Sequence, residues 1–77
     1  MTFVYVVYDS DEAAIEAAYT TEEAAFADAE LSHGKLTLEQ EFHFTKYPVK
    51  GEWHKLYVRP DGDYVSIDCL QVREEGK

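Results

Sequence analysis

The stretch from residue 19 to residue 34 constrains the fold most strongly, because it alone carries clear signals for both ends of a helix. Thr20 and Glu23 have the spacing of a capping box, in which each side chain accepts a hydrogen bond from the backbone N–H of the other residue. Glu22 and Glu23 also place negative charge at the positive end of the helix dipole. Gly34 supplies the left-handed conformation that ends many helices. We therefore expect one helix, with most of the remaining chain in strands.

The residues before this helix predict two strands. Residues 2–8 are β-branched or aromatic throughout, so we expect a central strand that is covered on both faces. Residues 13–19 are ambiguous, because their alanine content and a possible cap at Asp9 favour a helix. A helix that begins at Thr20 implies that the residues just before it are not helical, and the apolar side chains of this stretch alternate as in a strand. We interpret residues 13–19 as a second strand that forms a hairpin with the first.

The residues after the helix predict three more strands. Residues 36–46 alternate as a half-buried strand does, with the apolar side chains on one face. These apolar side chains are Leu36, Leu38, Phe42 and Phe44. Residues 53–59 and 64–72 flank a strong turn at residues 60–63 and so predict a hairpin. In this hairpin we expect Leu56 and Val58 to share a face with Val65 and Ile67. The predicted fold is a single α+β domain, residues 1–77, with an antiparallel sheet of four to five strands, one helix on one face, and the order ββαβββ.

The opening of the chain also resembles a group of small proteins. Val4–Tyr8, an acidic turn, Ile15–Tyr19 and the cap at residues 20–25 are similar to small accessory proteins of phages and bacteria, over about residues 2–30. In those proteins a strand–strand–helix opening is followed by further strands. Some proteins of this size class inhibit host defence systems, so the resemblance implies a protein that binds another protein. It brings no catalytic motif.

The charge is large and unevenly distributed. The chain has 16 acidic and 7 basic residues and a net charge of −9. Residues 1–41 contain ten acids and one lysine, whereas residues 42–77 contain six acids and six basic residues. A charge of this sign disfavours direct binding to nucleic acid or to an anionic membrane. We find no leader segment and no apolar run near the ~20 residues that span a bilayer, and therefore expect a cytoplasmic protein.

Acidic residues before and within the helix are the first candidate site. Spaced carboxylates can occupy a basic groove that is built for phosphates, so this surface predicts an inhibitor or nucleic-acid decoy that binds a protein partner. The alternative is that these residues are only the solvated face of the protein. The candidate residues are Asp9, Asp11, Glu12, Glu22, Glu23, Asp28 and Glu30.

Aromatic side chains on the last hairpin are the second candidate site. Trp53, Tyr57 and Tyr64 are expected on the sheet face that the helix leaves uncovered, where they would form a homodimer or partner interface. The alternative is that the loop at residues 47–52 and the C-terminal tail cover this face. Phe26 is expected either at the edge of the core or in a partner contact.

Catalytic and metal-binding signals are weak. His33, His43 and His54 are far apart and fall on different elements, which is not the close spacing of zinc ligands. Residues 9–12 and residues 61–63 resemble pieces of calcium loops, but turns explain both better. The single cysteine, Cys69, excludes an intrachain disulfide and is expected in the core. We therefore predict no cofactor and no enzymatic activity.

Overall fold

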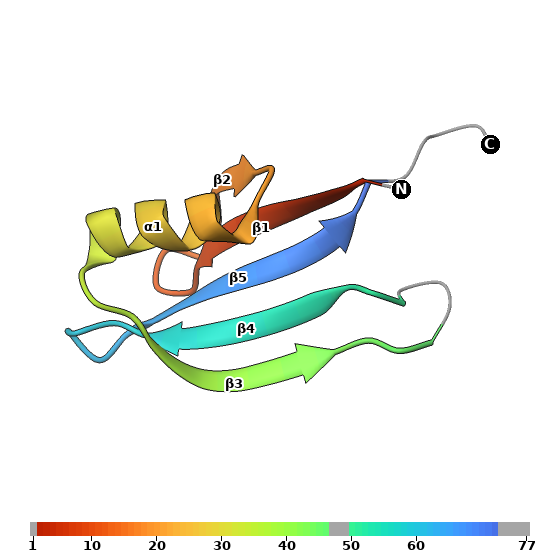
Figure 1. Cartoon of the computed structure of the whole chain (residues 1–77). Coiled ribbons are helices and arrows are strands. Elements are labelled where there is room, and N and C mark those ends of the chain that lie inside the picture. Colours follow the sequence, from red (N-terminus) through yellow and green to blue (C-terminus); the bar gives the residue numbers. More distant parts are fainter. Residues whose placement is uncertain (1, 47–49, 73–77) are drawn as a thin grey trace.

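The computed structural model describes residues 2–46 and 50–72, which form a five-stranded antiparallel sheet and one helix. The elements are β1 (Phe3–Asp9), β2 (Ala14–Tyr19), α1 (Glu22–His33), β3 (Thr37–His43), β4 (Trp53–Val58) and β5 (Tyr64–Gln71). The helix lies against one face of the sheet (Figure 1), so the predicted α+β class and the order ββαβββ are confirmed. In the described part of the chain, no helix is long and apolar enough to cross a membrane.

The strands lie in the order β2-β1-β5-β4-β3, and neighbouring strands are antiparallel throughout. β5 therefore lies between the β1–β2 hairpin and the β3–β4 pair, although it follows both of them in the sequence (Figure 1). Residues 14–19 pair with β1, so the interpretation of this ambiguous stretch as a strand is confirmed. A helix here would leave one edge of β1 without a partner, which explains why pairing overrides the helix propensity of alanine.

The helix begins one residue later than predicted. Thr21 is the N-cap, and its hydroxyl oxygen accepts from the N–H of Ala24 at 3.1 Å. The capping box at Thr20 is therefore wrong, because two adjacent threonines satisfy the same local rule and the sequence does not separate them. Gly34, with φ of 88°, ends the helix as predicted, and its N–H donates to the carbonyl of Glu30 at 2.8 Å.

Two alanines bring the helix onto the sheet. Ala25 and Ala29 are buried, whereas Leu31 on another side of the helix is 85% exposed. Small side chains let the helix backbone lie close to the strands beneath it. Phe26 packs beside this contact, with its ring centroid 5.4 Å from that of Tyr57, which agrees with a place at the edge of the core.

The pairing of strands divides the sheet into two faces. Residues that are opposite each other in neighbouring strands share a face, and the side that contacts the helix is the covered face. Three rows cross the covered face from β2 to β3: Ala14, Asp9, Val65, Tyr57 and Leu38; Ala17, Val7, Ile67, Lys55 and Glu41; and Tyr19, Tyr5, Cys69, Trp53 and His43. The fully buried side chains Val7, Val65 and Ile67 lie in these rows, so the core sits between the helix and the middle of the sheet.

The other side is the open face. Two rows cross it, Ile15, Tyr8, Ser66, Leu56 and Gln40, then Ala18, Val6, Asp68, His54 and Phe42. Val4, Leu70, Val58 and Tyr64 extend these rows at either end. No described element packs on this face. The prediction that β1 is covered on both faces is therefore wrong over residues 2–46 and 50–72, although both sides of β1 are apolar as predicted.

The register of the last hairpin also differs from the prediction. Tyr57 pairs with Val65 and Val58 pairs with Tyr64, whereas we expected Leu56 and Val58 to share a face with Val65 and Ile67. The cause is the turn, because Arg59 N–H donates to the carbonyl of Asp63 at 2.8 Å and so extends the hairpin by one pair. A shift of one residue moves every side chain of a strand to the opposite face.

The predicted strand is present as β3, but β3 is exposed along its whole length, so of the four apolar side chains expected on one buried face only Leu36, just before β3, is buried. The strand lies at one edge of the sheet, and the helix contacts β1, β2 and β5 instead. The pairing with β4 also shifts between Leu38 and Gln40, which is a β-bulge. This bulge places Leu38 on the covered face and Phe42 on the open face, although their spacing predicted one common face.

Candidate functional site

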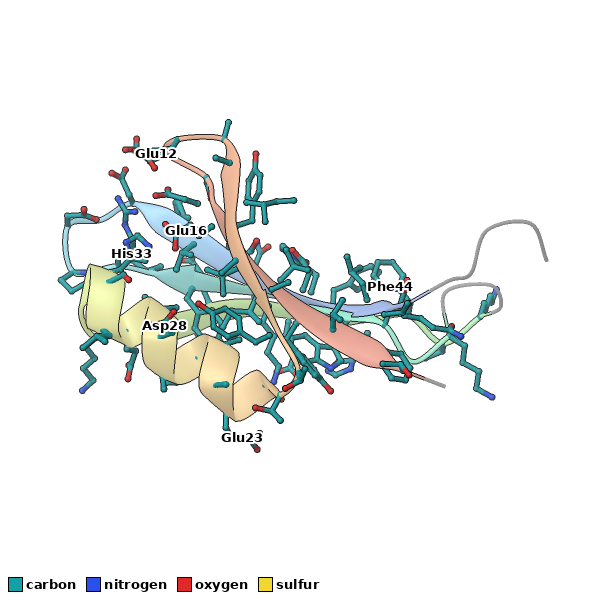
Figure 2. All side chains as sticks on the ribbon, turned by 90° about the horizontal axis from the view of Figure 1, so that it is seen from above. Glu12, Glu16, Glu23, Asp28, His33 and Phe44 are labelled. Atoms are coloured by element: carbon teal, nitrogen blue, oxygen red, sulfur yellow. The ribbon has the colours of Figure 1, made fainter. Side chains whose placement is uncertain are left out.

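Two turns and the end of the helix meet at one end of the sheet. β1 and β5 are antiparallel neighbours, so the turn that follows β1 lies beside the turn that precedes β5. The helix ends there too, since a Cβ added to Gly34 would lie 3.0 Å from Cγ of Pro60. Figure 2 shows Glu12 and His33 toward this end of the molecule and Phe44 toward the opposite end. This end gathers most of the charged contacts described below.

Arg59 is buried at the centre of this end, with its side chain 8% exposed. Its Nε and Nη2 atoms donate to the two oxygens of Asp61 at 3.3 and 3.1 Å, and Nη2 also donates to Asp63 at 3.1 Å. Its Nη1 atom donates to both oxygens of Asp9 at 3.3 and 3.4 Å. The hydrogen bonds to Asp61 and the surrounding carboxylates raise the pKa of Arg59, so this cation stays charged.

Asp9 is the buried partner of Arg59. Burial by itself would raise the pKa of this carboxyl group, but the N–H groups of Asp11 and Glu12 donate to it at 2.9 and 3.4 Å. Together with the positive charge of Arg59, these donors hold the pKa of Asp9 below its ordinary value of 3.8. Asp9 therefore shapes the turn after β1 and stays ionised, which supports the prediction of a turn at residues 9–12.

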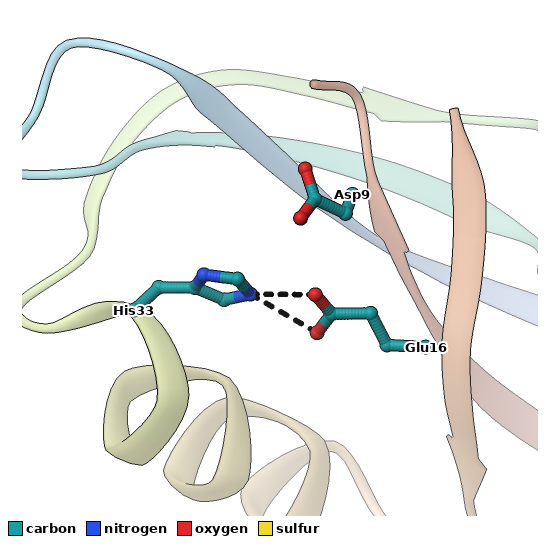
Figure 3. Close-up of side chains that lie close together, drawn as sticks. All are labelled: Asp9, Glu16 and His33. Atoms are coloured by element: carbon teal, nitrogen blue, oxygen red, sulfur yellow. Dashed lines mark hydrogen bonds and ion pairs between the residues drawn. The ribbon is translucent and has the colours of Figure 1, made fainter. Parts of the chain in front are cut away.

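His33 connects the helix to β2. Its Nε2 atom lies 2.8 and 3.0 Å from the two oxygens of Glu16 (Figure 3), and its Nδ1 atom lies 3.3 Å from Nη1 of Arg59. A guanidinium group can only donate, so Nδ1 accepts from Arg59 and Nε2 carries the ring proton that Glu16 accepts. The shift in pairing between Val7 and Tyr8 is what turns Glu16 toward the helix, where the simple alternation of β2 would turn it away.

A metal ion is one possible ligand of this cluster. Asp9, Glu16 and His33 offer three ligand atoms that all lie within 4.8 Å of one another (Figure 3). However, Nε2 of His33 has no free lone pair in the tautomer that Arg59 imposes, and a metal-bound histidine normally donates through its other nitrogen. Arg59 also already neutralises Asp9. The arrangement fits a site in which the guanidinium group of Arg59 occupies the place that a metal ion would otherwise take.

The predicted acidic surface is only partly free. Asp9 is buried, Glu22 pairs with Lys55 at 2.7 Å, and Glu30 accepts from the N–H of Leu36 at 3.0 Å. Asp28 accepts from the hydroxyl group of Tyr19. The remaining predicted residues Asp11, Glu12 and Glu23 are exposed. The helix therefore offers fewer free carboxylates than its sequence suggests.

The structure adds three carboxylates that the sequence analysis missed. Glu16, Asp61 and Asp63 lie beside Arg59 and His33, and the last two are 60% and 52% exposed. We define the acidic end as the six carboxylates at this end of the sheet: Asp9, Asp11, Glu12, Glu16, Asp61 and Asp63. One arginine, Arg59, forms ion pairs with three of these carboxylates, Asp9, Asp61 and Asp63. The balanced charge of residues 42–77 hid the contribution of Asp61 and Asp63, which only the pairing of β1 with β5 reveals.

The predicted aromatic face does not exist as one surface. Trp53 and Tyr57 lie on the covered face, where Trp53 packs against Tyr5 with ring centroids 5.8 Å apart and Tyr57 is buried. Tyr64 lies on the open face. The changed register of the β4–β5 hairpin is the reason. The loop and tail that were expected to cover these rings fall largely outside the described residues, at 47–49 and 73–77.

The remaining candidates have structural roles in the described part of the chain. Cys69 is buried as predicted, and burial raises the pKa of its thiol, which disfavours the reactive thiolate. His43 contacts Glu41 on the exposed edge strand. Asp61 accepts from the N–H of Asp63 at 3.0 Å, as expected of a turn. None of these groups forms a catalytic arrangement with another described residue.

Comparisons with protein-family models, with curated proteins and with solved structures found no match to this chain. The resemblance to small phage and bacterial accessory proteins therefore stays a prediction.

Proposed function

We propose that the protein is a non-enzymatic binding protein whose acidic end recognises a basic surface on a protein partner. The observation that supports this proposal is that six carboxylates from β1, β2 and two turns gather at one end of the sheet, where three of them share one buried arginine. Uneven charge of this kind attracts a partner of opposite charge over long distances and speeds the encounter.

The arrangement of the acidic end supports recognition rather than simple solvation. Arg59 holds Asp61 and Asp63 in place, and Asp9 holds the turn that carries Asp11 and Glu12. The carboxylates therefore have fixed positions before a partner arrives, which reduces the entropy cost of binding. A partner groove that normally binds phosphates would suit them, so the protein would act as an inhibitor that competes with nucleic acid.

The test uses two double variants that each remove two negative charges. Asp11→Asn with Glu12→Gln neutralises the tip of the acidic end, and Glu39→Gln with Glu41→Gln makes the same change on the edge strand β3. Wild-type and variant proteins would capture partners from the native host, and a purified captured protein would then be titrated by calorimetry. We expect the tip variant to bind at least about tenfold more weakly and the β3 variant to bind like the wild type.

Salt provides the second readout. Wild-type affinity should fall steeply between about 0.01 and 0.15 M salt, because screening shortens the range of the attraction. If the captured partner binds nucleic acid, an excess of duplex DNA should displace the protein from it. Equal binding by both double variants, or binding that salt does not weaken, would contradict the proposal.

A further inference from the structure

The open face is apolar over most of its rows. Ile15, Phe42, Leu70 and Tyr64 on this face are 68%, 57%, 41% and 39% exposed, and Val4, Val6, Tyr8, Leu56 and Val58 lie between them. Exposed apolar side chains that gather on one face, rather than standing singly, are typical of an interaction surface. The sequence of β1 shows the same feature, because a strand with two apolar sides is typical of a sheet that is covered on both faces.

The polar groups near the middle of this face are already satisfied. Asp68 contacts Nδ1 of His54 at 2.5 Å through one oxygen and accepts from the hydroxyl group of Ser66 at 3.3 Å through the other. Burying these groups as a bonded set costs much less than burying an unpaired carboxylate, because each group keeps its hydrogen-bond partner when water is removed. This trio therefore does not prevent the open face from being buried by a second layer.

The charge distribution indicates what covers the face. Its two central rows contain no lysine or arginine and only one carboxylate, Asp68, on a chain with a net charge of −9. A second copy would bring one carboxylate of each chain, Asp68, into the contact, and each Asp68 is paired with His54 of its own chain. Contact between two acidic ends would instead bring six carboxylates of each chain together. A basic partner would favour the acidic end, and an anionic partner finds no lysine or arginine in the two central rows.

We propose that two copies of the chain pack open face to open face and form a two-layer β-sandwich with the helices outside. Flat sheet faces pack about 10 Å apart, with their strands rotated by about 30°. Val6 and Leu56 would lie near the centre of the contact. The acidic ends stay at the ends of the sheets, so the dimer leaves them free and does not depend on the function proposed for them.

The test compares the same charge change on the open face and elsewhere. Leu56→Glu places a carboxylate at the centre of the open face. Leu31→Glu makes the same change on the outer side of the helix, where Leu31 is 85% exposed. Sedimentation equilibrium should show dimers of the wild type and of Leu31→Glu at micromolar concentration. Leu56→Glu should raise the dimer dissociation constant at least about tenfold, because each interface would bury two unpaired carboxylates.

Two further measurements keep the test decisive. Leu70→Glu changes a more exposed position and replaces Leu56→Glu if circular dichroism shows that the latter does not fold. Isotope-filtered nuclear Overhauser effects between labelled and unlabelled copies should involve the methyl groups of Val6 and Leu56. Added salt should leave the dimer intact or strengthen it, because it screens the repulsion between two acidic chains.

A wild-type chain that stays monomeric up to millimolar concentration would overturn the proposal, and would mean that another segment or partner covers the face. Equal association of Leu56→Glu, Leu70→Glu and Leu31→Glu would overturn it too, as would contacts between copies that run through β3.

Discussion

The two faces of the sheet use the same strands but bury their side chains to different extents. On the covered face, Val7, Val65 and Ile67 are fully buried beneath the alanine side of the helix. On the open face, Val6 and Leu56 are only partly buried, although they are equally apolar. The comparison teaches that apolar alternation predicts a strand, whereas the second layer of the structure decides which of its sides stabilises the fold.

The largest effect is expected where the covered face meets the acidic end. Arg59→Met should lower the free energy of unfolding by about 3–5 kcal/mol, because Asp9 would remain buried without its cation. Urea denaturation followed by circular dichroism would measure the loss. His54→Gln is the matched control on the open face, where Asp68 stays partly exposed and the expected loss is small. Equal losses in the two variants would remove the distinction between the faces.

Truncation of a large side chain on each face tests the comparison directly. Ile67→Ala should cost about 2–5 kcal/mol, because it leaves a cavity in the closed core. Leu56→Ala should cost less than Ile67→Ala in dilute protein, because Leu56 is only partly buried and water can reach the space that it leaves. Denaturation at several protein concentrations would sharpen the result, since a dimer makes the cost of Leu56→Ala grow with concentration. A cost at Leu56 that matches Ile67 at every concentration would contradict the open-face description.

The cap of the helix that covers one face should have a smaller effect. Thr21→Ala should lower stability by about 1 kcal/mol, because the N–H of Ala24 loses its acceptor. Thr20→Ala should be nearly neutral, since Thr20 is exposed and lies before the cap. Thermal denaturation of both variants would show the difference. A larger loss for Thr20→Ala would restore the capping box that the sequence predicted.

The smallest effect concerns the contact between the helix and β2. The hydrogen bond to Asp28 raises the pKa of Tyr19 to about 12. Because the raised pKa belongs to the folded state, this contact stabilises the protein fully below the ordinary tyrosine value of 10.0 and is lost as the pH rises toward 12. Absorbance titration of the tyrosines should show one group moving to lower pH in Asp28→Asn. A titration curve that does not change would rule out this contact in solution.

Much of the fold could be predicted from local patterns in the sequence. The helix, its end at Gly34, the strand at residues 14–19 and the order of elements all follow from capping, alternation and turn residues. The errors arose where one residue changes the register. The five-residue connection from Arg59 to Asp63 and the bulge near Glu39 each move side chains to the opposite face, and neither leaves a signal in a hydrophobic pattern.

The candidate site was harder to predict, because it depends on contacts between distant residues. Asp9 and Arg59 are 50 positions apart, and Glu16 and His33 are 17 positions apart. Asp61 and Asp63 were interpreted only as turn residues, which they are, but they also hold Arg59. The predicted acidic surface and the acidic end therefore have only Asp9, Asp11 and Glu12 in common.

The place of β5 in the sheet has a consequence for how the protein folds. Without residues 64–71, the chain can form the β1–β2 hairpin with its helix and the β3–β4 pair. No strand pairing of the described sheet then joins these two parts. The pairing of Phe3 with Gln71 closes nearly the whole chain into one loop. Long-range pairing of this kind slows folding, and β1 and β4 each keep an unpaired edge until it occurs. A nascent chain is thus prone to aggregate until β5 becomes available, because this strand joins the two parts of the described sheet.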